Sequence, residues 1–110
     1  MKIRFMLFSL LSVFLLFPPV ANGAESVMSP MEWDMDHKEA DIKDADFNLP
    51  TSDPTLCEDA CAQNPECMAW TYIRPNTIQG PHARCWLKHS IPPKQSNANT
   101  VTGYKILKKE

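Results

Sequence analysis

The chain has 110 residues, with 11 Lys and Arg against 13 Asp and Glu, so its formal net charge is −2. A chain of this length accommodates one domain with a modest core. Its mildly acidic balance gives no electrostatic basis for binding nucleic acid. We therefore expect a single small domain without a nucleic-acid partner.

Residues 1–23 are predicted to be an export signal. Lys2 and Arg4 stand at the start of an apolar run that continues to Phe17, and small residues precede a cleavage site after Gly23. The run is too short to make a good membrane span, although an uncleaved N-terminal anchor is the competing interpretation. We expect a secreted or periplasmic product with no stable membrane insertion after cleavage, in a compartment where disulfides persist.

Residues 24–32 are interpreted as a short leader, and residues 33–108 as the domain itself. The first part of the domain, residues 33–49, is acidic and has Ile42 and Phe47 as its few apolar anchors. We expect this part to be an irregular or edge-strand segment that wraps the core.

A helix is predicted between Asp53 and Pro65. Asp53 is a favourable N-cap, Pro54 fits the first helical position, and the Asn-Pro pair ending at Pro65 stops the helix. Cys57 and Cys61 are four residues apart and therefore lie on one face of this helix. The helix thus presents two sulfur atoms to whatever it packs against.

Three later runs are predicted to be strands because they are rich in β-branched and aromatic residues or alternate polar with apolar residues: 68–73, 84–88 and 101–107. Proline, asparagine and glycine between the first two runs indicate a long hairpin loop at 74–84. Residues 91–100 are expected to be a polar loop. The sheet is expected to be antiparallel.

The four cysteines, Cys57, Cys61, Cys67 and Cys85, allow three disulfide pairings. Two cysteines one helical turn apart are badly aligned for a bridge to each other. Cys67 follows the helix by a tight turn and can reach back to Cys61, whereas Cys85 on the neighbouring strand can reach Cys57. The favoured set is Cys57 with Cys85 and Cys61 with Cys67.

These motifs resemble the PAN/apple domain family in its short bacterial exported form. The resemblance is carried by Cys57-x3-Cys61, the run from Asn64 to Tyr72, the run Arg84-Cys85-Trp86-Leu87-Lys88 and a late Gly103, and it covers residues 33–108. It implies a small disulfide-stapled α+β fold, with a curved antiparallel sheet cradling one helix and the same two bridges. It also implies a role in binding proteins or carbohydrates.

Metal and catalytic sites are weakly supported. His82 and His89 lie close to Cys85, but the cysteine spacing lacks the paired C-x2-C pattern of zinc sites, and an oxidising compartment favours bridges. His37, His82 and His89 are expected to be ordinary surface residues. Four bridged cysteines leave no thiol nucleophile. We expect no cofactor, no metal and no enzymatic activity.

The acidic stretch is expected to be a solvated edge, since it lacks the glycine and the spacing of a calcium loop. Its members are Glu32, Asp34, Asp36, Glu39 and Asp41.

Two groups of residues are candidates for recognition. The aromatic group, Trp70, Tyr72 and Trp86, suits sugar rings or a partner's pocket, and burial in the core is the competing role, above all for Trp70. The second group is a basic cluster at one end of the hairpin, suited to an anionic group or an acidic surface, with an ordinary solvated hairpin as the alternative. Its members are Arg74, His82, Arg84, Lys88 and His89.

The tentative ligand-binding residues are Arg74, His82, Arg84, Trp86 and Lys88. The sequence therefore predicts a monomeric, non-catalytic module that binds a protein or a glycan. The alternative is an accessory or inhibitor domain that docks onto a protease or a larger envelope protein, with the hairpin loop at 74–84 as its wedge.

Overall fold

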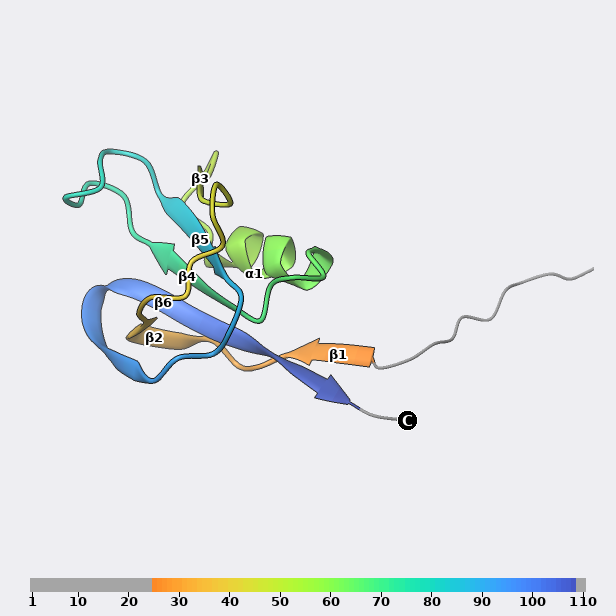
Figure 1. Cartoon of the computed structure of the whole chain (residues 1–110). Coiled ribbons are helices and arrows are strands. Elements are labelled where there is room, and N and C mark those ends of the chain that lie inside the picture. The colour runs from red at the N-terminus through yellow and green to blue at the C-terminus, as the bar shows by residue number, and fades with distance from the viewer. Residues whose placement is uncertain (1–24, 109–110) are drawn as a thin grey trace, which may run out of the picture.

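The computed structural model describes residues 25–108 as one antiparallel sheet with a single helix (Figure 1). The predicted signal segment, residues 1–23, lies outside the described residues. The elements are β1 (Glu25–Met28), β2 (Glu32–His37), β3 (Phe47–Asn48), α1 (Pro54–Gln63), β4 (Ala69–Ile73), β5 (Arg84–Lys88) and β6 (Lys94–Lys108). None of the helices among residues 25–108 has the length and apolar character needed to cross a membrane.

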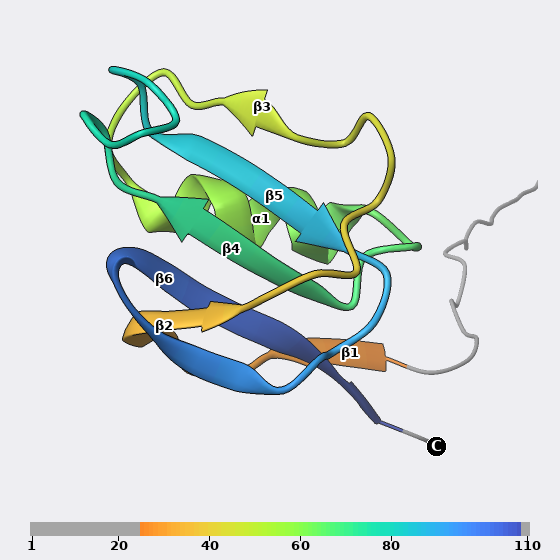
Figure 2. The ribbon, with the colours of Figure 1, turned by 60° about the vertical axis from the view of Figure 1, so that its left-hand side comes forward.

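The sheet has the strand order β1-β6-β4-β5-β3, and β2 pairs with β6 outside this path. Every pairing is antiparallel. The helix lies across one face of the sheet, behind β4 and β5 in Figure 2. The predicted α+β fold, a curved antiparallel sheet cradling one helix, is confirmed.

The core is set by the pairing register of the three central strands. Trp70 on β4 pairs with Leu87 on β5 and with Gly103 on β6, and two residues later Tyr72 pairs with Cys85 and Val101. Alternate strand residues share a face, so these side chains point together toward α1 and are all buried. Trp70 is completely buried, as its predicted core role requires.

Gly103 is required by the indole of Trp70. A Cβ atom placed on Gly103 would lie 2.8 Å from the ring carbon Cζ2 of Trp70, closer than real Cβ atoms approach other heavy atoms. The glycine therefore lets the backbone of β6 pass directly against the largest side chain of the core.

Helix α1 begins and ends where the sequence predicts. The Asp53 side chain accepts a hydrogen bond from the backbone N–H of Thr55 at 3.0 Å, and Pro54 occupies the first turn. Asn64 is the C-cap, and its N–H donates to the carbonyl of Cys61. Cys57 and Cys61 are the two buried residues of the helix.

Both predicted disulfides are confirmed. Cys57 is joined to Cys85, which fastens α1 to β5, and Cys61 is joined to Cys67, which closes the turn between α1 and β4. All four cysteines are fully buried and none is a free thiol. The helix is thus linked covalently to β5 through Cys57 and to the turn that leads into β4 through Cys61.

Two segments differ from the prediction. Glu25–Met28, within the predicted leader 24–32, forms β1 and pairs with residues 105–108 of β6. The polar loop predicted for 91–100 is wrong from Lys94 onward, because β6 begins there and pairs with β2. The side chains at 94–96 are exposed, so the strand is held by backbone hydrogen bonds and leaves no apolar alternation in the sequence.

The pairing of β2 with β6 is interrupted in the middle. Glu32 and Trp33 pair with Thr102 and Val101, but Met35 already pairs with Ser96. Asp34, at the interruption, has φ 64°, and β6 curls around this point so that both of its halves contact β2 (Figure 2).

Candidate functional site

The face of the sheet opposite α1 carries polar and aromatic side chains. Thr71 pairs with Trp86, and Ile73 pairs with Arg84, so these four residues point to the same side. They alternate with the core residues of β4 and β5 and therefore lie away from the helix. Trp86, whose burial the sequence leaves open, is half-buried on this outer face.

A cleft of about 310 Å³ lies on the outer face, at the lower end of the range for small-molecule sites. Its floor is formed by buried Thr71 and Thr100, and Trp86 and Ile73 give it an apolar wall. The full lining is Asp36, Lys38, Glu39, Asp41, Thr71, Ile73, Gln79, Trp86, Lys88, Asn97 and Thr100. Strands β2, β4, β5 and β6, the segment after β2 and the hairpin loop all contribute to it.

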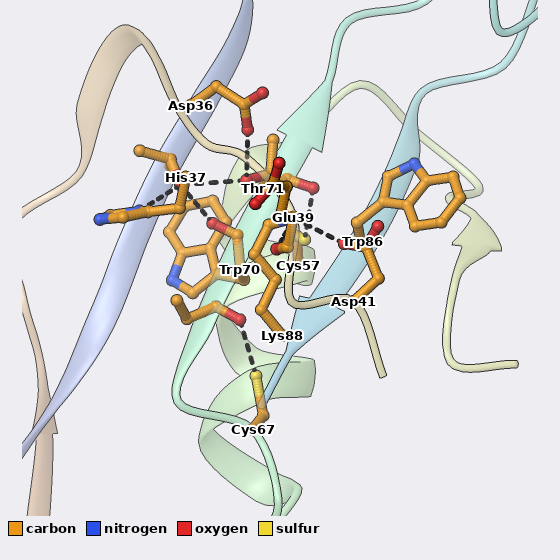
Figure 3. A network of polar contacts seen from close by, with 12 residues as sticks. Asp36, His37, Glu39, Asp41, Cys57, Cys67, Trp70, Thr71, Trp86 and Lys88 are labelled. Carbon is orange, nitrogen blue, oxygen red and sulfur yellow. Dashed lines mark hydrogen bonds and ion pairs between the residues drawn. The ribbon is translucent and has the colours of Figure 1, made fainter. Parts of the chain in front are cut away.

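The indole of Trp86 is held in a defined position beside the cleft. Its Nε1–H donates to the side-chain oxygen of Gln79 at 3.0 Å. The guanidinium of Arg84 lies 5.6 Å from the ring centroid, within the distance at which a cation is attracted to an aromatic face. In Figure 3 the indole lies beside Asp41, at the edge of a group of polar side chains.

Lys88 is buried beneath the acidic segment. Its Nζ donates to a carboxylate oxygen of Asp41 at 2.6 Å and to the backbone carbonyl of Glu39 at 3.0 Å. Its side chain is only 4 % exposed, whereas that of Asp41 is 41 % exposed. Lys88 is therefore not part of an ordinary solvated hairpin, the alternative to its predicted place in a basic binding cluster.

The two predicted arginines are also paired with acidic residues from upstream. Arg84 forms an ion pair with Asp46 and donates to the side-chain oxygen of Asn48 at 2.5 Å. Arg74 forms an ion pair with Asp34 at 2.7 Å and lies over the ring of Trp33.

The acidic segment is therefore not simply a solvated edge. Four acidic side chains form ion pairs: Asp41 and Asp46 with basic residues of β5, Glu32 with Lys94 of β6, and Asp34 with Arg74, which directly follows β4.

The five predicted ligand-binding residues do not form one open patch. Trp86 and Lys88 line the cleft, whereas Arg74, His82 and Arg84 lie outside its lining. His82 is exposed on the hairpin loop. The cleft residues that were not predicted come from the acidic segment, from β4 and β6, and, with Gln79, from the hairpin loop. Only a contact between segments far apart in the chain could have identified them.

A hydrogen-bond network connects the floor of the cleft to the interior (Figure 3). The Thr71 hydroxyl donates to Asp36 at 2.9 Å, and the Thr102 hydroxyl donates to the backbone carbonyl of Trp70 at 2.5 Å. His37 Nδ1 lies 2.9 Å from the Thr102 oxygen. Because the single Thr102 proton is already engaged, Nδ1 of His37 must carry the proton and donate it to Thr102.

His37 is a buried residue, contrary to the prediction that it lies on the surface. It is only 1 % exposed, and its ring meets Tyr104 edge-on at a centroid distance of 6.0 Å. Burial disfavours the charged imidazolium and, together with the nearby Lys94, lowers the pKa of His37 below its ordinary value of 6.5. His82 and His89 are exposed, as predicted.

Comparison with known families gives one match, to the PAN domain, over residues 35–88. No curated protein and no solved structure matches the chain. The matched segment includes α1, β4, β5, both disulfides and every residue of the cleft lining except Asn97 and Thr100. With the sheet, the helix and the two bridges in place, the chain belongs to the PAN domain family.

Proposed function

We propose that this protein is an exported, non-catalytic module that binds a carbohydrate in the cleft on the outer face of its sheet. PAN domains generally mediate the binding of proteins or carbohydrates and are typically non-catalytic. The two disulfides and the predicted cleavage after Gly23 support an oxidising compartment outside the cytoplasm. The chemistry of the cleft favours a carbohydrate as the ligand.

The observation that carries this proposal is an oriented tryptophan beside a group of hydrogen-bonding side chains. Trp86 offers an apolar surface to the C–H groups of a sugar ring, as aromatic residues do in recognition sites. The carboxylates of Asp36 and Glu39 and the amides of Gln79 and Asn97 suit its hydroxyl groups. The volume of about 310 Å³ suits a small ligand such as a terminal sugar unit.

The test is a titration of the purified, disulfide-bonded protein with a panel of mono- and disaccharides by isothermal titration calorimetry. We expect Trp86→Ala to weaken binding of the best sugar by about tenfold or more, because tryptophan anchors contribute strongly to recognition. Trp33→Ala is the matched control. Trp33 is more exposed than Trp86 and also lies under an arginine, with Arg74 at 5.4 Å from its ring, but it is not part of the cleft.

Trp33→Ala should retain full affinity, and both variants should keep the circular dichroism spectrum of the parent. Equal loss in the two variants, or normal binding by Trp86→Ala, would contradict the proposal.

A second function, docking onto a protease or a larger envelope protein, is favoured by one residue of the hairpin loop. Ile78 is 100 % exposed, which suits an apolar residue that inserts into a partner. Cross-linking in the native compartment distinguishes the two functions. Loss of a cross-linked partner in Ile78→Ser, with no sugar bound by the parent, would favour docking over the carbohydrate function.

A further inference from the structure

Acidic side chains outnumber basic ones in the lining of the cleft, which is the opposite of what an anion-binding site requires. Three carboxylates, those of Asp36, Glu39 and Asp41, face two lysines, Lys38 and Lys88. Lys88 is engaged by Asp41 and by the Glu39 carbonyl and is almost fully buried, so it has little left to offer a ligand. Lys38 is the remaining cation, and it is exposed.

Two carboxylates of the cleft keep their capacity to accept hydrogen bonds. Asp36 accepts from the neutral hydroxyl of Thr71, and neither Asp36 nor Glu39 forms an ion pair among residues 25–108. Because ionised carboxylates only accept, they favour ligand groups that donate: hydroxyls and, more strongly, ammonium groups.

The arginines that could attract an anion are held elsewhere. Arg74 and Arg84 are paired with Asp34 and Asp46, and neither lines the cleft. An anionic group in the cleft would meet the carboxylates of Asp36 and Glu39, and Lys38 is the one lysine of the lining that is exposed to it. Like charges brought together in a partly buried site are unfavourable and reject the wrong ligand.

We propose that the cleft discriminates by charge, taking neutral sugars and preferring amino sugars while rejecting uronic and sulfated sugars. This inference rests on the proposed carbohydrate function and names its ligand class. It makes Asp36 and Glu39 the residues that determine specificity, and it assigns the basic residues of the hairpin to the stability of the fold.

Three probes that share one ring and differ in charge test the inference: glucosamine, glucose and glucuronic acid. At a pH where the amine is protonated, glucosamine should bind roughly fivefold more tightly than glucose, as expected for a partly exposed charge contact. Glucuronic acid should bind more weakly than glucose. Raising the salt concentration from 0.05 to 0.5 M should reduce both differences, because exposed charges are screened.

Variants of the cleft should change the discrimination in opposite directions. Asp36→Asn keeps an oxygen that accepts from Thr71 but removes the charge, so it should bring the affinities for glucosamine and glucose together, and Glu39→Gln should act in the same direction. Lys38→Gln removes the opposing cation and should increase the preference for glucosamine. Asp59→Asn, an exposed change on α1 across the sheet from the cleft, is the control and should leave the ratio unchanged.

The outcomes separate this inference from the function on which it rests. If sugars bind and depend on Trp86, but glucuronic acid binds as well as glucosamine, the charge inference is overturned and the carbohydrate function stands. If no sugar of the panel binds, both are overturned. If N-acetyl-lysine amide binds and no sugar does, the cleft accepts a lysine side chain of a protein partner, and the carbohydrate assignment is replaced.

Discussion

His37 shows how one buried side chain makes the stability of this fold depend on pH. Its ring donates to Thr102 through Nδ1, and protonation would place a second N–H and a positive charge in the interior. The charged groups that influence it are Lys94, Glu32, Asp36 and Lys88, and burial outweighs the two carboxylates, so its pKa is lowered in the folded state. The unfolded chain therefore binds the proton more readily than the native protein.

The predicted consequence is a loss of stability on mild acidification. Because the folded pKa lies below the unfolded value of about 6.5, the contribution of His37 is complete above pH 6.5 and is lost as the pH falls from there to the folded pKa. Urea denaturation at a series of pH values should show this slope in the parent. His37→Gln should flatten it, and His82→Gln, at an exposed site, should leave it intact. An equal slope in all three proteins would show that His37 is not the titrating group.

The contact between the acidic segment and the basic strands is the main feature at the scale of elements. Both partners are recognisable in the sequence as charged stretches, but the acidic one is predicted to face solvent and the basic one to bind an anionic ligand or face solvent. The ion pairs join residues separated by 38 to 62 positions, such as Arg84 with Asp46 and Lys94 with Glu32. Local patterns carry no information on which distant charges will meet, so the cleft that forms between the two elements is also absent from the prediction.

In the Lys88–Asp41 ion pair the lysine is buried and the aspartate is partly exposed, so we expect mutations of the two residues to reduce the free energy of unfolding by different amounts. Asp41→Ala leaves a buried ammonium without its carboxylate and should cost about 1–2 kcal/mol of unfolding free energy, a value reduced because Asp41 is partly exposed. Lys88→Met removes the buried charge and fills most of its volume, so it should cost less than about 1 kcal/mol. Urea denaturation of both variants at neutral pH measures the difference. A larger loss in Lys88→Met would contradict the order of effects.

At the scale of the whole molecule, the disulfides are a large share of a small stability. Folded domains are typically stable by only about 5–15 kcal/mol. The sequence separations of the bridges Cys57–Cys85 and Cys61–Cys67 are 28 and 6, and in the chain-entropy model the bridges stabilise by about 3.6 and about 2.2 kcal/mol. Together they account for much of the margin between the folded and unfolded states.

The double variant Cys57→Ala with Cys85→Ala should therefore be less stable than Cys61→Ala with Cys67→Ala, since it releases the longer loop and detaches α1 from β5. The midpoint of thermal unfolding, followed by circular dichroism, ranks the two variants. The reverse ranking would mean that the short bridge also holds the turn before β4 in a way that loop length does not capture.

The parts of the fold that could be predicted are those determined by neighbouring residues or by the geometry of the cysteines. The cap at Asp53, the stop at Pro65, the alternation in β5 and the two bridges all depend on residues close together or on a limited number of pairings. The strand β1 escaped prediction because it has only four residues, and the first half of β6 because it is polar and exposed; both are stabilised by backbone pairing with distant partners. The cleft depends on the same distant pairings.

The position of β6 sets an order of events for the nascent chain. This strand is the partner of β1, β2 and β4, so three strands made earlier have no neighbour on that side until Lys94 and the residues after it have been synthesised. Contacts this distant in sequence form late and slowly. The sheet can therefore be completed only after the residues of β6, Lys94–Lys108, have been synthesised.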